Sequence, residues 1–222
     1  HVTVSGNRAV ETGAGIFTGT ADGETAISQS TITANFFESD LLPGGGIHHD
    51  GTGTLSLLST IVAGNFSSAD VSGPVDPASA FNLIGAGDGG SLGLVDGVHH
   101  NQVGSTANPL DPRLGSLADH GGPTLTHALI LGSPAINAGN NFSGLEFDQR
   151  GQGFEREIGR QTDVGAVELQ IAVSTPPMVA VGSGPGMAGT VRVFNSVTGE
   201  ELFHLQPFGD VDVGGVRVAT GE

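Results

Sequence analysis

The sequence contains no cysteine, tryptophan, tyrosine or lysine, and each absence restricts what the chain can do. Without cysteine the chain has no disulfide and no thiolate ligand for a metal ion. Cysteine usage therefore does not indicate whether the protein works in an oxidising or a reducing compartment. All seven basic residues are arginines, against 23 Asp and Glu, which gives a formal net charge of −16. Because nucleic-acid binding needs clustered positive charge to neutralise phosphates, we expect no DNA or RNA partner.

Long apolar runs are absent as well. No run approaches the roughly 18–20 residues that cross a bilayer, so we expect no membrane-spanning segment. The start at His1, without an initiator methionine, leads us to expect a piece of a longer protein. An acidic surface attracts cations, and a structural calcium ion is the one cofactor that the charge favours, although no loop specifies its site.

What the chain does contain is glycine, at 38 positions, and a repeated phrase. The phrase reads TVSGN at 3–7, TITAN at 31–35 and TIVAGN at 60–65, with steps between the asparagines of 28 and 30 residues. Apolar and polar residues alternate inside it, as in Leu55 and Leu57 between Thr54 and Ser56, which is typical of a strand with one buried face. Repeats of 20–50 residues indicate a solenoid or a propeller.

Short strands, glycine corners and a period of about 30 residues favour a right-handed parallel β-helix, in which strands of successive coils stack about 4.8 Å apart. In that fold Asn7, Asn35 and Asn65 stack as an internal amide ladder, each satisfying the buried polar groups of the next. The alternative is three ordinary turn asparagines. We expect this domain to occupy residues 1–172, with irregular closing coils from about residue 111 that seal the end of the solenoid.

Several strings resemble bacterial secreted and surface proteins with predicted outer-membrane-type β-helix repeats and the choice-of-anchor β-helix domain. They are STIVAGN (59–65), DVSG (70–73), FNLIG (81–85), DPRLGSLADHGGPTLTHALILGSPAINAG (111–139), DQRG (148–151) and DVGAVEL (163–169). The resemblance implies an extracellular or cell-surface location in a bacterium. Within its phrases, an ion pair between Arg150 and Asp163 is expected to lock the closing coil.

Composition changes after residue 172. Residues 173–177 form a proline-rich linker, and 178–222 alternate like strands around glycine-rich turns. This part resembles one blade of an FG-GAP-like β-propeller, and we expect an antiparallel module that is incomplete because one blade cannot close a propeller. The calcium loop of that family is not matched, since only Asp210 and Asp212 are acidic in the corresponding run. Exposed strand edges must then pair with other sequence or another chain.

Paired histidines are the other metal candidates. His48 and His49 precede Asp50, and His99 and His100 follow Asp96, so stacked coils could bring them together as a zinc or nickel site. Adjacent histidines on a strand point to opposite faces, however, which favours exposed loop histidines.

Catalytic motifs lack their structural context. GPGMAG (184–189) matches GxGxxG but precedes a strand rather than a helix, and GGSLG (89–93) matches GxSxG inside a glycine-rich loop. The β-helix polysaccharide lyases use acidic calcium ligands with a nearby Arg or Lys base. Here no aspartates recur at coil spacing, and no Lys, Trp or Tyr is present.

We therefore expect a non-catalytic structural or adhesive segment of a large secreted or cell-surface protein. Its partners would be copies of itself, the remainder of a larger chain, or cell-surface glycans. Open strand edges allow end-to-end assembly into a fibre. The alternative is a carbohydrate-binding or polysaccharide-cleaving β-helix module. A calcium-bound acidic groove lined by Arg would favour this alternative, whereas a smooth polar flank with no cleft would favour the scaffold.

Overall fold

The computed structural model describes residues 1–10, 13–19, 23–37, 45–51, 53–66, 69–87, 93–159, 161–170, 178–185, 189–207, 209, 216 and 218. Within these ranges the chain is all-β, as predicted, and its one helical element is the short 3-10 helix η1, Val98–His100. The chain divides into two compact units, His1–Ala172 and Val173–Glu222. The division falls beside the proline-rich linker predicted at 173–177, which lies outside the described residues.

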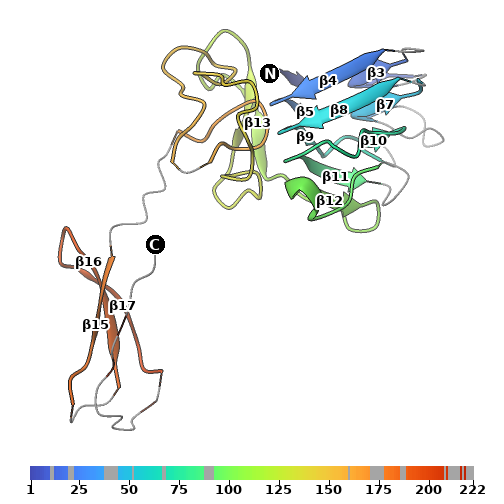
Figure 1. Cartoon of the computed structure of the whole chain (residues 1–222). Coiled ribbons are helices and arrows are strands. Elements are labelled where there is room, and N and C mark those ends of the chain that lie inside the picture. The colour runs from blue at the N-terminus through green and yellow to red at the C-terminus, as the bar shows by residue number, and fades with distance from the viewer. Residues whose placement is uncertain are drawn as a thin grey trace. The chain divides into compact units, whose positions relative to one another are not determined.

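The largest sheet of the first unit is entirely parallel. Its order is β1-β5-β9-β11-β12, so each strand pairs with the strand that the next pass of the chain contributes (Figure 1). The strands are β1 (Thr3–Ser5), β5 (Thr31–Thr33), β9 (Ile61–Val62), β11 (Leu83–Gly87) and β12 (Gln102–Ser105). Parallel pairing of sequential strands requires a long connection back to the same edge, and here the connection carries further strands.

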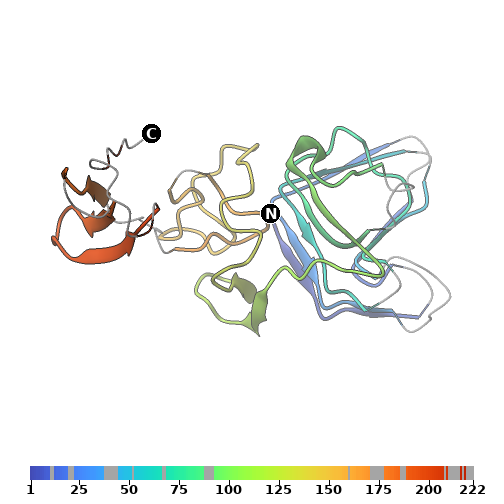
Figure 2. The same cartoon turned by 90° about the horizontal axis from the view of Figure 1, so that it is seen from below.

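Three smaller parallel sheets are formed in those connections. They are β3 (Ile16–Thr18) with β7 (Ile47–His49) and β10 (Val71–Ser72), β4 (Glu24–Ser28) with β8 (Thr54–Leu58), and β2 (Arg8–Ala9) with β6 (Phe36–Phe37). Each pass of the chain thus adds one strand to several sheets. We call each pass a layer and residues 1–105 the stack. Figure 2 shows the layers superposed around a common interior.

The layers become shorter along the chain. Backbone-to-side-chain bonds between equivalent corners join Asn7 to Asn35 and Asn35 to Asn65, 28 and 30 residues apart. Later they join Thr60 to Asn82 and Asn82 to Asn101, only 22 and 19 residues apart. The period of about 30 therefore holds only for the first layers, which explains why the sequence repeat fades after residue 65.

Left-handed backbone conformations recur at two corners of the layers. Gly6, Ala34 and Gly64, with φ of 72°, 56° and 70°, each precede a ladder asparagine. Glycine adopts this conformation without strain, and alanine does so at a cost. The second corner carries positive φ at Gln29, Ser59, Phe81 and His100. These bends turn the chain sharply between the sheets. The four residues of the second corner are of four different types, so the sequence does not reveal that they occupy equivalent positions.

Two apolar clusters lie on opposite faces of the largest sheet. Ile32, Val62 and Ile84 point into the stack, where they pack with Ile47, Leu55 and Leu57. Their neighbours Ile61, Ala63 and Leu83 point outward and pack with Leu129, Ala135 and Val164. A sheet buried on both faces reads as a continuous apolar run, as in TIVAGN, rather than as alternation.

Residues 106–170, which we call the closing segment, cover that outer face. The segment contains one antiparallel hairpin, β13 (Leu114–Ala118) with β14 (Thr126–Leu129), and is otherwise made of turns. Figures 1 and 2 both show it beside the stack and not at either end. The expectation that these residues form a last coil sealing the end is therefore wrong, because the outward face of β9 and β11 is apolar and has to be buried laterally.

The second unit is an antiparallel meander. Its strands β15 (Met178–Gly182), β16 (Val191–Asn195) and β17 (Glu201–Leu205) pair in sequence order, and Val216 donates its N–H to Ser183 O beside β15. Val191 and Val193 of the central strand are buried, whereas Met178, Val181, Phe203 and Leu205 are exposed.

Candidate functional site

The three predicted ladder asparagines lie directly above one another. Asn7 Nδ2 donates to Asn35 Oδ1 at 2.9 Å, and Asn35 Nδ2 donates to Asn65 Oδ1 at 2.9 Å. Each acceptor oxygen also receives the backbone N–H of the asparagine above it, at 3.1 Å. The second amide hydrogens of Asn35 and Asn65 go to Val4 O and Ile32 O. The buried amide of Asn35 is thus used entirely to join its layer to the layers on either side.

Asp70 terminates this ladder, which the sequence reasoning missed. Its Oδ1 accepts both the backbone N–H and the Nδ2 of Asn65, at 2.9 and 2.8 Å, and its Oδ2 accepts the N–H of Ala86. Burial raises the pKa of Asp70 above its usual range, and these N–H donors oppose the rise. A carboxylate offers no donor, so the chain of amides ends there.

A second ladder runs along the other corner. Asn82 donates from its backbone N–H and from Nδ2 to Asn101 Oδ1, at 3.0 and 2.9 Å, and Asn101 Nδ2 donates to Ser79 O. Above it, Thr60 N–H donates to Asn82 Oδ1, and Val2 N–H donates to Ser30 Oγ. Because Ser, Thr and Asn alternate at this corner, no residue repeats visibly in the sequence.

The predicted ion pair between Arg150 and Asp163 has the wrong acidic partner. Arg150 pairs with Asp148, at 2.6 Å between its terminal nitrogen and Oδ2, and also donates to Glu168 O. Asp163 instead accepts the backbone N–H groups of Asn137 and Leu169. Asp148 is only two residues from Arg150 and accepts its backbone N–H in a tight local turn. This turn places the Asp148 carboxylate beside the guanidinium.

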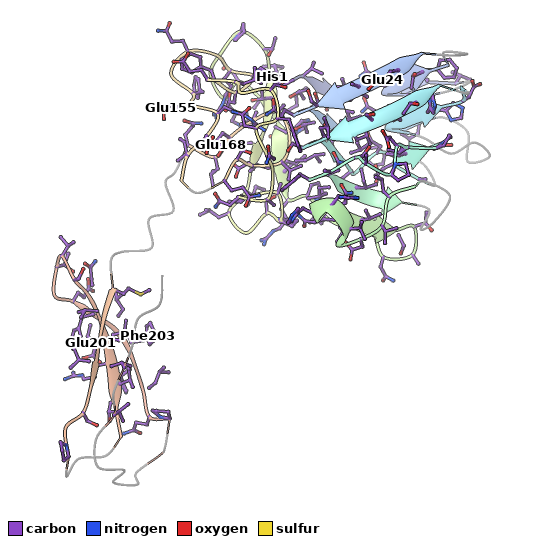
Figure 3. All side chains as sticks on the ribbon, in the orientation of Figure 1. His1, Glu24, Glu155, Glu168, Glu201 and Phe203 are labelled. Carbon is purple, nitrogen blue, oxygen red and sulfur yellow. The ribbon has the colours of Figure 1, made fainter. Side chains whose placement is uncertain are left out.

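Arg156 is the buried cation nearest to Asp163. Its side chain is 0 % exposed, donates to Asp163 O at 3.0 Å and lies 3.9 Å from Glu168 Oε2. Burial raises the pKa of Glu168 to about 8, and Asp163 adds to the rise, while the N–H of Asp163 and the Arg156 charge oppose it. Figure 3 shows Glu168 within the closing segment. All these bonds hold turns of that segment together.

The two predicted pairs of histidines do not form a common site. His49 is buried, with Nε2 3.1 Å from Gly53 O, whereas His48 points to the other side of β7 and stacks on Phe17. His99 and His100 lie in η1, and Asp50 is exposed. Within the described residues no three His, Asp or Glu side chains come together as a metal site. Asp210 and Asp212 lie outside the described residues.

The described surface also contains a polar cleft that no motif of the sequence predicts. It consists of two hollows that share Gln161, of about 220 and 390 Å³. The smaller is lined by Asn140, Asn141, Glu157 and Thr162, and the larger by Asp96, His100, Gln102 and Asn137. We call this the Gln161 cleft. It lies where the closing segment meets the last layers of the stack, so it joins residues about 60 positions apart.

One lining residue of the cleft, His100, belongs to a cluster of aromatic rings. His100 stacks on Phe81 at 4.5 Å between ring centroids, and Phe142 meets Phe81 edge-on at 5.7 Å. Phe142 is 45 % exposed. The positive φ at Phe81 and His100 turns both residues at the same corner of successive layers. The amides and carboxylates of the lining are therefore connected, through His100, to the rings of Phe81 and Phe142.

Comparison with family models, curated proteins and solved structures finds no match to this chain. The resemblance to choice-of-anchor and FG-GAP-like proteins consequently remains a prediction. In the described residues, the only helical element is far too short to cross a membrane.

Proposed function

We propose that the first unit is a right-handed parallel β-helix and that the chain is a non-catalytic structural and adhesive segment of a large secreted or bacterial cell-surface protein. The parallel register of β1, β5, β9, β11 and β12 and the two ladders support the β-helix. Its right-handedness follows from the strong preference of parallel crossovers.

The placement of the buried charges supports a non-catalytic role. Asp70, Asp148, Asp163 and Glu168 each accept backbone N–H groups of neighbouring turns. A catalytic carboxylate has to reach a substrate, whereas these are at most 2 % exposed. These carboxylates accept hydrogen bonds from backbone N–H groups in turns, which have no partner strand to bond to.

The second unit supports attachment to other surfaces. We propose that it is a propeller-type blade, because its three antiparallel strands form a meander and leave Met178, Phe203 and Leu205 exposed. A blade buries such residues against its neighbours in a complete propeller.

The observation that carries the structural proposal is the β1 edge of the stack, which has no strand beside it among the described residues. Val2 and Gly6 direct their backbone groups to the next layer, through Thr31 N–H to Val2 O and Gly6 N–H to Ala34 O. By alternation the N–H groups of Thr3 and Ser5 face away from the stack. In the described residues no donor reaches Asn7 Oδ1, so the ladder also stops with a free acceptor at this end.

The opposite end is closed by the chain itself. On β12, Gln102 N–H donates inward to Asn82 O, while the outward N–H groups of Val103 and Ser105 donate to Asp96 Oδ1 and Asn108 O. Asp96 on this edge also discourages another strand from adding.

In a solution of this chain alone, the unpaired β1 edge and the closed β12 edge favour pairing of two copies over the fibre expected from two open edges, and in a longer protein a preceding strand would take the same place. A second copy that places its own β1 beside this one extends the sheet and covers Val4, Ile16 and Ile27, which are only partly buried at this end of the core. Heterologous stacking of one end on the other is disfavoured, because the β12 edge has no free outward N–H.

The test is the mass of the purified chain in solution, measured by light scattering with and without calcium. We expect a dimer that Val4→Lys converts to a monomer, since an inward-pointing lysine blocks strand addition. Val103→Lys is the matched control, because Val103 is also partly buried and packs at the β12 end of the same core.

A monomeric wild-type chain, or a dimer that survives Val4→Lys, would overturn association through β1. Open-ended growth that Val103→Lys abolishes would favour the fibre instead. The measurement with calcium shows whether a bound cation is required to reduce the repulsion between two copies that each carry a net charge of −16.

A further inference from the structure

We propose that the Gln161 cleft binds an uncharged oligosaccharide. This inference names the ligand of the adhesive role and rests on that part of the proposed function. A sugar ring presents hydroxyls around its edge and C–H groups on its faces, so a site for it needs both hydrogen-bonding side chains and an aromatic surface.

The hydrogen-bonding side chains are held in place by bonds at their other atoms. Gln161 Nε2 donates to Gly139 O at 2.7 Å, and Gln102 Nε2 donates to Pro134 O at 2.9 Å. Val103 N–H donates a hydrogen bond to Asp96 Oδ1 and so holds the carboxylate in place. Oε1 of both glutamines and Oδ2 of Asp96 have no partner among the described residues, and each can accept a hydrogen bond from a hydroxyl.

Donors and further acceptors come from the closing segment. The side-chain amides of Asn137 and Asn140 have no partner in the described part of the chain, although the backbone of both residues is hydrogen-bonded. Thr162 lines the smaller hollow, and its Oγ1 is buried without a partner. An unpaired buried hydroxyl costs free energy, and a ligand hydroxyl that reaches Thr162 would remove that cost.

The aromatic surface is provided by Phe142, His100 and Phe81. Phe81 is in contact with both other rings, and His100 belongs to the lining of the larger hollow. Phe142 follows Asn141 of the smaller hollow. Rigid rings beside fixed amides offer a platform for the apolar face of a sugar at a small entropic cost.

The charges of the lining select against acidic sugars. Asp96 and Glu157 are acidic, and among the described lining residues only His100 can carry a positive charge. A uronic acid would be repelled, whereas neutral hexoses or N-acetylhexosamines would not. The larger hollow has the size of a small-ligand pocket, and the smaller continues it past Gln161, so a chain of several rings fits better than one.

The experiment is titration calorimetry of the full chain with chitohexaose, cellohexaose, maltohexaose and hexagalacturonate. We expect at least one of the three neutral hexamers to bind and hexagalacturonate not to bind. Phe142→Ala and Asn140→Ala should each weaken binding roughly tenfold, because one removes the stacking ring and the other an amide.

Matched controls exist for both variants. Asn108 is exposed and uses only its backbone groups, and Phe66 is 59 % exposed and packs on Phe36, outside the aromatic cluster of His100. Asn108→Ala and Phe66→Ala should therefore bind like the wild type. No binding of any neutral hexamer, or equal losses in the controls, would overturn the site. The Val4→Lys variant separates the two proposals: it should lose association and still bind the sugar.

Discussion

At the scale of single residues, the closing segment buries ionisable groups that a loop normally keeps in water. Glu168 is 1 % exposed, and its two oxygens accept the N–H groups of Ile158 and Asp163, at 3.3 and 2.9 Å. The hydrogen bonds favour the charged form but do not compensate for the loss of water, so the pKa rises to about 8. Glu168 is therefore a carboxyl group whose folded environment favours the protonated state.

We predict that this group makes the protein less stable as the pH rises. Below pH 4.5 Glu168 is protonated both folded and unfolded, whereas between pH 4.5 and about 8 only the folded chain retains the proton. The free energy of unfolding should fall across that window by up to about 1.4 kcal/mol per pH unit. Urea denaturation at pH 5, 6, 7 and 8 measures the slope.

Glu168→Gln removes the titrating group and should flatten this slope, although the raised pKa values of Asp70 and Asp163 leave part of it. Glu155→Gln is the matched control, since Glu155 is exposed (Figure 3) and should leave the slope unchanged. An identical slope in wild type and Glu168→Gln would show that Glu168 is ionised throughout the window.

At the scale of elements, side-chain ladders hold short strands together. β9 has only two residues and β5 has three, so their backbone bonds are few. Asn35 makes bonds to the layer on each side: it accepts from Asn7 and donates to Asn65 Oδ1 and Val4 O. The ladder thus adds side-chain bonds between layers at a corner where the backbone makes only a few, such as Ala34 N–H to Gly64 O and Phe36 N–H to Asn7 O.

We predict that Asn35→Ala lowers the free energy of unfolding by about 2–4 kcal/mol, because it leaves buried donors and acceptors unpaired on both neighbouring layers. Asn7→Ala is the control at the exposed end of the ladder, with a neighbour on one side only, and should cost about 1 kcal/mol or less. Chemical denaturation followed by circular dichroism compares the two. Equal costs would contradict a cooperative ladder.

At the scale of the whole first unit, the stack and the closing segment share one sheet as a common wall. Leu83 and Ile61 face the closing segment, and Ala166 N–H donates to Thr31 Oγ1 across the same boundary. Ser59 Oγ accepts from Asn140 N–H at 2.6 Å. We infer that neither part can open without exposing apolar surface of the other.

The prediction at this scale is a single cooperative transition for the first unit. Leu83→Ala should lower its stability by about 2–4 kcal/mol, since it leaves a cavity between the two parts. Hydrogen exchange should show the amides of Ile61 and Val164 losing protection together and by the same amount. Loss of protection at Val164 alone would mean that the closing segment unfolds independently.

Particular residues show how far the sequence could be interpreted. Asn7, Asn35 and Asn65 could be placed together from sequence, because equal spacing and repeated neighbours put them at one corner. Asn82 and Asn101 could not, because their layers are only 22 and 19 residues long and share no phrase with the first ones. Arg150 was assigned the wrong carboxylate, since sequence reasoning could not choose between Asp148 and Asp163 in a segment without regular structure.

The sequence by itself determined the all-β class, the short parallel strands and the first ladder, since these follow from local alternation, glycine corners and a constant period. Only the tertiary structure decided that the closing segment lies beside the stack, that one end of the stack is closed by Asp96 and that the Gln161 cleft exists. These features arise where segments without a shared period pack against each other. Their contacts depend on three-dimensional shape and leave no repeated pattern along the chain.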